Sequence, residues 1–398
     1  MVPALTLYRI LSLTLLSSLL AACGGGGDAP QNPPPAPVSY QYISAGQPEA
    51  PVQISPPQEP STMIMGGGAA DVDSAFQWMI QRSGVRPGTG GHFVVLRAVR
   101  PKVDDYTQYI YYSDDQQNTT TAAKPGWVGG AAMGLTSVET LIIPDRAAAN
   151  DPFVNQVLAR AQAVFISGGD QANYIRYWKN TALHTTLNQL MANNVPIGGT
   201  SAGLAVLGQF DFSALNDSVS SAEALADPYN EFMTLDPDPL SLTGGFLTPG
   251  SFKNAILDSH FDERNRMGRL MTFVSRLIAP VGASGCAGGI LAAGTSPING
   301  ARAVGVGEQA ALLVEGDGQR KPYTARRAVN PDLVMAGAIY FVRPLQAATT
   351  CQPGKPLTAY NMEISKLDDD RVFNLSDWSG LPTYTIDVVD GVLSREPY

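Results

Sequence analysis

Histidine, cysteine and charge are all scarce in this sequence. Its 398 residues include three histidines and three cysteines, and 15% are charged, against about a quarter in an average soluble domain. A structural zinc site would need nearly all the histidines and cysteines at once, and their spacing matches no known ligand pattern. We therefore expect neither a metal nor another cofactor.

The charge that is present is mostly negative. The formal net charge is −9, from 35 acidic and 26 basic residues, and no basic run occurs. Such a chain is a poor phosphate binder, which argues against a nucleic-acid partner. Hydrophobic residues make up 44% of the chain, enough for a real core in one large domain or two small ones.

The N-terminus has the pattern of a secretory signal. Arg9 precedes an apolar run, and small residues lead to Cys23. No later stretch is apolar for long enough to span a membrane. Residues 20–23 resemble the lipobox of bacterial lipoproteins, which predicts a signal peptide over 1–22 and a lipid on Cys23. We thus expect export to the cell envelope, in the periplasm or at the surface, with the lipid as the only membrane contact. The alternative is a plain signal peptide with an incidental cysteine.

Residues 23–60 are rich in glycine and proline, and ten prolines lie between residues 24 and 60. This composition predicts a tether that builds no core. Export would also place Cys286 and Cys351 in an oxidising compartment, where they are the remaining pair and can form a disulfide. Two buried thiols are the alternative reading.

The body of the chain alternates between short apolar runs and helical patterns. The runs lie at 62–65, 92–96, 141–143, 163–166, 195–197, 303–306, 311–314 and 384–389. The helical patterns lie at 72–82, 152–162, 174–193, 204 onward and 262–277. This order predicts an α/β fold with a mostly parallel sheet. We expect a catalytic domain over 61–345 and a C-terminal extension over 346–398 that packs on it.

Ser201 is the candidate nucleophile. Residues 199–203 fit the pattern G-x-S-x-G, with a short strand before and a helical run after. That context is typical of an elbow that exposes a serine at the sheet edge, with the N–H of Ala202 as an oxyanion donor. A glycine-rich turn with a helix-capping serine is the alternative.

A nucleophilic serine needs a base, and His260 is the best candidate among the three histidines. His92 begins an apolar strand and His184 lies within a helical pattern, so both are expected to be structural. His260 is the last histidine in the chain. If a triad exists, we expect the acid that orients the imidazole to follow His260 in the sequence, and Glu308 is the leading candidate.

Four segments, at 166–171, 199–203, 258–270 and 305–312, together resemble one family. They are similar to the cyanophycinase branch of the S51 serine peptidases, relatives of aspartyl dipeptidase. Residues 66–68 and 245–250 resemble the family too, and the likeness covers about 61–320. It implies a three-layer, flavodoxin-like sandwich of the class I glutamine amidotransferase type. A serine in place of a cysteine at the elbow argues against an amidotransferase.

The resemblance also implies roles for individual residues. Ser201 would be the nucleophile, His260 the general base and then acid, and Glu308 the group that orients the imidazole. The oxyanion would rest on the amides of Gly169 and Ala202. The residues implied around the substrate are Gln171, Asp258, Ser259, Arg264, Arg266 and Arg269. The arginines could instead form a solvated or salt-bridged helix edge.

The substrate implied is a peptide bond next to an aspartyl residue, foremost in cyanophycin, which such enzymes cut to β-aspartyl-arginine. The sequence departs from the family at Ser259, Gly307 and Ala310, where glutamine, aspartate and threonine are common. None of these changes removes a triad member. An isoaspartyl or aspartyl dipeptidase, and a non-catalytic surface-binding lipoprotein, stay as alternatives, and the sequence leaves room for a homodimer.

Overall fold

The computed structural model describes residues 39–398, apart from 56, 58, 69, 100–105, 114–126, 240–244, 295–299 and 332–335. The predicted signal peptide, Cys23 and the first part of the tether lie outside the described residues. Among the described residues, no helix is long and apolar enough to span a membrane.

The first sheet has nine strands within the described part of the chain, in the order β1-β4-β3-β5-β6-β2-β11-β12-β15. These strands are β1 Gln41–Gly46, β2 Ser61–Met65, β3 His92–Arg97, β4 Ser137–Ile142, β5 Ala163–Ile166, β6 Ile197–Thr200, β11 Ala310–Glu315, β12 Thr324–Val329 and β15 Val372–Asn374. The five strands from β4 to β2 run parallel to one another. The outer strands pair in an antiparallel sense.

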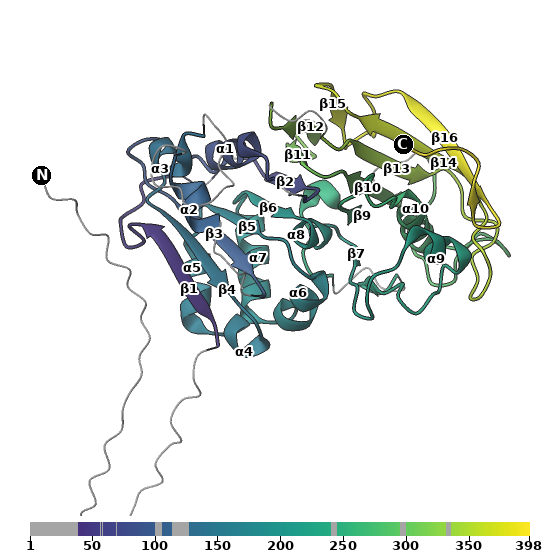
Figure 1. The fold of residues 1–398 in the computed structure, drawn as a ribbon, viewed down its shortest axis with the longest axis horizontal. Coiled ribbons are helices and arrows are strands. Elements are labelled where there is room, and N and C mark those ends of the chain that lie inside the picture. Colours follow the sequence, from purple (N-terminus) through teal and green to yellow (C-terminus); the bar gives the residue numbers. More distant parts are fainter. Residues whose placement is uncertain are drawn as a thin grey trace, which may run out of the picture. The chain divides into compact units, whose positions relative to one another are not determined.

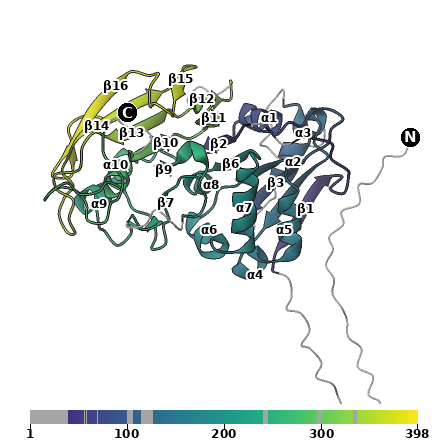
Figure 2. The same ribbon diagram turned by 180° about the vertical axis from the view of Figure 1, so that it is seen from behind.

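Helices cover both faces of this sheet (Figures 1 and 2). One face carries α1 Asp73–Arg82, α2 Tyr106–Tyr111 and α3 Gly129–Met133, and the other carries α4 Arg146–Ala149, α5 Pro152–Ala159, α6 Gln171–Trp178 and α7 Ala182–Ala192. Side chains alternate along a strand, so Phe93 and Val95 of β3 pack on the α1 side. Val94 and Leu96 pack on the α7 side. The predicted three-layer α/β fold is confirmed.

The pattern at 174–193 predicted one helix, but the structure has two, α6 and α7. The helical path is interrupted at Asn180, whose φ of 58° is left-handed. Thr181 then starts α7 by accepting a hydrogen bond from the N–H of His184 at 3.4 Å. A polar residue that tolerates positive φ, followed by a capping threonine, therefore divides the expected helix.

The described residues also form a second sheet of six strands, which was not anticipated, in the order β17-β16-β14-β13-β10-β9. The strands are β9 Ala255–Asp258, β10 Arg302–Val306, β13 Ile339–Pro344, β14 Ala359–Leu367, β16 Thr383–Val389 and β17 Val392–Leu393. Helices α9 Ser221–Ala226 and α10 Met267–Arg276 bury their apolar side chains against one face of it. Four short elements complete the described fold: α8 Ala202–Ala205, the paired strands β7 Asp211–Phe212 and β8 Leu235–Asp236, and the 3₁₀ turn Gly250–Phe252.

The C-terminal segment 346–398 is built into both sheets. β14 pairs with β13 and β16 with β14, while β15 pairs with β12 in the first sheet. Cys286 and Cys351 form a disulfide between residues 65 positions apart.

The predicted tether was too long at its C-terminal end. Residues 41–46 form β1, which pairs with β4 over six residue pairs. The ring of Tyr40 stacks on the ring of Phe153, and the ring of Tyr42 meets the same ring edgewise. The Tyr42 hydroxyl also donates a hydrogen bond to the buried carboxylate of Glu139 at 2.7 Å. Two tyrosines thus give this part of a proline-rich segment enough contact to join the sheet.

Candidate active site

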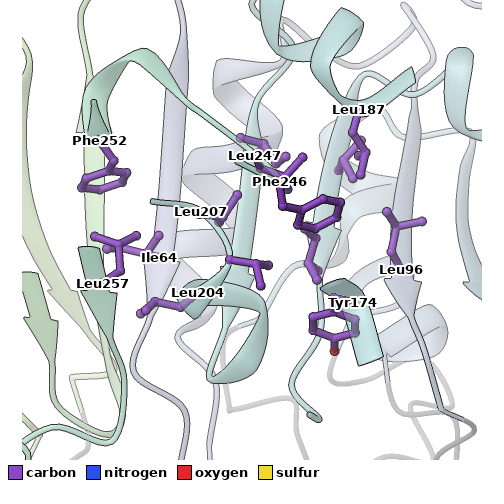
Figure 3. Packing of buried hydrophobic residues seen from close by; sticks show 14 of the residues in the cluster. Ile64, Leu96, Tyr174, Leu187, Leu204, Leu207, Phe246, Leu247, Phe252 and Leu257 are labelled. Carbon is purple, nitrogen blue, oxygen red and sulfur yellow. The ribbon is translucent and has the colours of Figure 1, made fainter. Parts of the chain in front are cut away.

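Ser201 stands at a sharp turn between β6 and α8. Its φ of 53° and ψ of −115° place it in a backbone region that residues with a side chain rarely adopt. A β-carbon on Gly203 would lie 2.1 Å from the carbonyl oxygen of Ile166, so only glycine fits there. Leu204 and Leu207 hold the segment after the turn in the core among Ile64, Leu257 and Phe246 (Figure 3). This packing fixes the backbone from which the serine projects.

The structure brings Ser201, His260 and Glu308 into one line of hydrogen bonds. Ser201 Oγ lies 2.7 Å from Nε2 of His260, and Nδ1 of the same ring is hydrogen-bonded to Oε1 of Glu308. His260 lies two residues after the end of β9, and Glu308 lies between β10 and β11. With the proton on Nδ1 donated to the carboxylate, Nε2 is free to accept the serine proton.

Three successive carbonyls at the end of β2 position this set. Met65 accepts from the N–H of Ser201 at 3.1 Å, Gly66 from that of His260 at 2.8 Å, and Gly67 from that of Gln309 at 2.8 Å. One short segment therefore fixes the backbone at the serine, at the histidine and next to the glutamate.

The imidazole is electrostatically suited to act as a base. Burial lowers the pKa of His260 below its ordinary value, and the positive charges of Arg264 and Arg266 lower it further. The hydrogen bond to Glu308 acts in the opposite direction. The ring is therefore neutral at neutral pH and able to take a proton.

A cavity of about 210 Å³ opens beside Ser201. Every residue predicted to bind substrate or oxyanion lines it: Gly169, Gln171, Ala202, Asp258, Ser259, Arg264, Arg266 and Arg269. Glu308 lies behind the imidazole and is not part of this lining. Among the described residues, no group of three or more histidine, cysteine, aspartate or glutamate side chains is arranged to hold a metal ion.

Within the cavity wall, Asp258 and Arg269 neutralise each other. Nε and Nη2 of Arg269 donate to the two oxygens of Asp258 at 2.7 and 2.6 Å, and both side chains are almost fully buried. Arg266 donates to the carbonyl of Ser259 at 2.7 Å. Arg264 is the arginine that projects, with 53% of its side chain exposed. All three predicted arginines thus form ion pairs within the protein: Arg269 and Arg266 with Asp258, the latter at 3.3 Å, and Arg264 with Glu308 at 3.8 Å.

Several residues at the cavity and beside Glu308 were not predicted from the sequence. Ala214, Asp217 and Ser218, from the segment after β7, line the cavity. Glu263 accepts a hydrogen bond from the N–H of Glu308 at 2.9 Å, and burial, with a hydrogen bond to Asp262, raises its pKa to about 7. The segment 211–257 is rich in aspartate and serine, and this composition alone does not place any of its residues at the cavity.

A C-terminal tyrosine also supports the histidine segment. The hydroxyl of Tyr398 accepts from the N–H of Met267, the first residue of α10, at 2.9 Å. Its ring meets those of Phe261 and Tyr340 edgewise. Nothing in the sequence pattern linked residue 398 to His260.

The other two histidines lie in structural networks. His92 Nδ1 is 2.7 Å from the Oγ of Ser137, and both residues are buried. His184 Nε2 is 2.5 Å from the carbonyl oxygen of Phe246.

Part of the chain is similar to known peptidases. Residues 131–276 match peptidase family S51. The cyanophycinase of Synechococcus elongatus is 25% identical over 248 residues, which cover 61% of this chain and 62% of that protein. The cyanophycinase of Trichormus variabilis is 24% identical over 274 residues, 66% of this chain and 76% of the relative. That of Geminocystis herdmanii is 29% identical over 144 residues, 36% and 47% of the two chains.

The chain spans less than two thirds of the length of the Synechococcus relative. The family match contains Ser201 and His260, whereas Glu308 and the glycines at 66–68 lie outside it. The matched segment is thus similar to peptidase family S51, and the curated relatives reported above are cyanophycinases.

Proposed function

We propose that the chain is a serine peptidase that hydrolyses peptide bonds next to aspartyl residues, with cyanophycin as its main substrate. The observation that carries the proposal is the contact between Ser201 Oγ and His260 Nε2 at 2.7 Å, with Glu308 hydrogen-bonded to the other ring nitrogen. A surface-binding protein would have no need for a buried, oriented imidazole next to a serine in a strained turn.

The reaction would be an acyl transfer. Ser201 Oγ attacks the scissile carbonyl as its proton moves to Nε2 of His260, and Glu308 stabilises the resulting imidazolium. The N–H groups of Gly169 and Ala202, which both line the cavity, would hold the oxyanion. The carbon–nitrogen bond then breaks as Nε2 returns the proton to the leaving amine. Water, activated by the same imidazole, releases the acyl group from the serine.

The aspartyl preference would come from the arginines. Arg264 and Arg266 line the cavity beside the nucleophile, and a guanidinium binds a carboxylate with two parallel hydrogen bonds. A β-aspartyl residue offers a free carboxylate close to its scissile amide. The proposed products from cyanophycin are β-aspartyl-arginine dipeptides, in line with the names of the relatives.

The test is to offer the purified full chain cyanophycin granules, β-aspartyl-arginine and a panel of aspartyl dipeptides. Dipeptide release from granules that falls about a thousandfold or more in Ser201→Ala supports the proposal. Turnover of dipeptides alone would identify an aspartyl dipeptidase. If wild-type protein turns over none of these substrates, the catalytic proposal is wrong and a binding role takes its place.

We also propose that the chain is exported and held at the cell envelope by a lipid on Cys23. The support is the charged start, the apolar run and the small residues before that cysteine. Labelled palmitate should enter the wild-type protein and not Cys23→Ser. Equal labelling of both proteins, or of neither, would contradict the lipid anchor.

A further inference from the structure

His260 lies in a left-handed turn between β9 and α10. Its φ of 46° is one that residues with a side chain rarely adopt, and such a conformation persists only where the surroundings fix it. At the start of the turn, the N–H groups of His260 and Phe261 donate to the carbonyls of Gly66 and Val306. At its far end, α10 begins after Arg266, whose side chain makes no capping hydrogen bond. The far end therefore leaves the first N–H groups of the helix to partners from elsewhere.

The hydroxyl of Tyr398 supplies such a partner. It accepts a hydrogen bond from the N–H of Met267, the first residue of α10, at 2.9 Å. It also donates to the carbonyl of Phe261, whose oxygen lies 3.4 Å away, and a hydroxyl can do both at once. The ring of Tyr398 meets those of Phe261 and Tyr340 edgewise, with centroids 6.1 and 5.6 Å apart. One side chain thus contacts both the residue after His260 and the residue at which the helix begins.

Tyr398 is in turn fixed by β16. The hydroxyl of Tyr384, on this strand, donates to the carbonyl of Pro397 at 2.7 Å. The N–H of Ser394 donates to the carbonyl of Asp387 at 2.8 Å, and Oγ of Ser394 accepts from the N–H of Asp387 at 3.0 Å. These bonds anchor the chain before Tyr398 to the second sheet, so its hydroxyl reaches the turn from a defined position.

We propose that Tyr398 is a positioning residue that holds the imidazole of His260 within reach of Ser201. The inference rests on the proposed function. Tyr398 is not part of the cavity lining, so it acts through the turn and not on the substrate. Without its hydroxyl, the turn would lose its bond at the start of α10 and relax away from the serine. Such a shift matters because a misplacement of about 1 Å costs about a hundredfold in rate.

The test measures how fast a fluorophosphonate labels Ser201 in the full chain. In this reaction Oγ forms a bond to phosphorus, the phosphorus–fluorine bond breaks to release fluoride, and Nε2 of His260 takes the serine proton. The rate reports on the serine and the histidine without any peptide substrate. Tyr398→Phe keeps the ring and removes the hydroxyl, and it should slow labelling by about tenfold. Ser201→Ala should not be labelled at all.

Tyr384→Phe tests the link to β16. It removes the bond to Pro397 and should slow labelling by less than Tyr398→Phe does, because Tyr398 keeps its own bonds. Combined with Tyr398→Phe, it should cause no further loss, since both changes act through the same hydroxyl. Independent losses of stability would instead give effects on the rate that multiply, and that result would contradict the inference.

Tyr229→Phe is the matched control. This half-buried tyrosine also donates a hydroxyl hydrogen bond, to the carbonyl of Ala287 at 2.8 Å, and lies outside the cavity lining. The variant should lose about as much in urea midpoint as Tyr398→Phe and keep the wild-type labelling rate.

Equal labelling rates in Tyr398→Phe and wild type, or equal losses in Tyr398→Phe and Tyr229→Phe, would overturn the inference. Labelling of wild type at Ser201 without hydrolysis of any aspartyl peptide would contradict the proposed function alone. A wild type that the probe does not label at Ser201 would overturn both, since no reactive serine would be present for the histidine to serve.

Discussion

Gly67 lies directly against the imidazole of His260. A β-carbon built on this glycine would be 2.6 Å from Cε1 of the ring and 3.1 Å from Cβ of Ser201. Its carbonyl also accepts the hydrogen bond from Gln309, next to Glu308. Absence of a side chain at residue 67 is thus a condition for the close approach of the serine and the histidine.

Gly67→Ala should therefore disrupt catalysis by displacing the ring. A misplacement of about 1 Å costs about a hundredfold in rate, so we expect kcat on a β-aspartyl peptide to fall by at least that factor. The φ of Gly67 is +91°, and alanine in this region adds about 1–2 kcal/mol of strain.

Gly88→Ala separates the effect of backbone strain from the effect of displacing the imidazole. Gly88 has a φ of +90°, and no atom lies within 4 Å of the position where its β-carbon would stand. It should lose a similar free energy of unfolding and keep the wild-type kcat. A similar loss of kcat in both variants would show that stability, and not the contact with His260, limits activity.

The pH dependence of kcat/KM should report the environment of His260. The base must be neutral, so kcat/KM rises as pH increases through the pKa of His260. Burial and the charges of two arginines place the midpoint of this rise, the acidic limb of the profile, below the ordinary pKa value of 6.5. Arg264→Gln removes one of these charges and should shift the limb to higher pH by roughly a few tenths of a unit.

Arg320→Gln is the control, because this arginine lies on the exposed turn between β11 and β12. It should leave the limb in place. A limb that moves to lower pH in Arg264→Gln would contradict the electrostatic account, whatever happens to the rate at the optimum.

The sheet and the turn that carries Ser201 could be predicted because their signals are local. Central parallel strands are apolar on both faces, so β3 and β5 appear as continuous runs in the sequence. The strand, glycine and serine order around Ser201 similarly lies within a few residues. Strands at the margin of the core, such as β1 and β12, have mixed patterns and depend on partners elsewhere in the chain.

The rest of the site depends on contacts between distant segments. Asp217 enters the cavity through the bonds of Arg269 to Ser218 and Val219, some 50 residues away in sequence. Tyr398 lies 131 residues from Met267, whose N–H donates a hydrogen bond to the tyrosine hydroxyl. No local pattern encodes such pairs, so exposed loop residues can be placed at a site only after the chain has folded.

Asp258→Asn should be strongly destabilising. Asp258 and Arg269 are a buried bidentate pair, and removal of one partner leaves an uncompensated charge at a cost of about 3–5 kcal/mol. Urea denaturation measures the free energy of unfolding. Asp368→Asn, which removes the partner of half-buried Lys366 at the surface, should cost less than about 1 kcal/mol. Similar small losses in both variants would indicate that Arg269 can reach water or another partner.

Glu263 should make the protein less stable as pH rises toward neutrality. Its pKa is raised from 4.5 to about 7, chiefly by burial, so the folded chain holds this proton more tightly than the unfolded chain. That contribution is complete below pH 4.5 and is lost as pH increases through about 7. Glu263→Gln should therefore show a smaller fall in unfolding free energy between pH 5 and pH 8 than wild type, measured by urea titration. An equal fall in both proteins would assign the dependence to other groups.

The disulfide between Cys286 and Cys351 should contribute to stability through the unfolded state. It joins residues 65 positions apart, and closing a loop of this length restricts the unfolded chain enough to stabilise the fold by about 2–4 kcal/mol. The double variant Cys286→Ser with Cys351→Ser should lose that amount in urea denaturation. Dithiothreitol should lower the midpoint of the wild type toward that of the variant and leave the variant unchanged, because only the wild type has a bond to reduce. A wild-type midpoint that does not respond to the reductant under unfolding conditions would contradict a stabilising role for the bond.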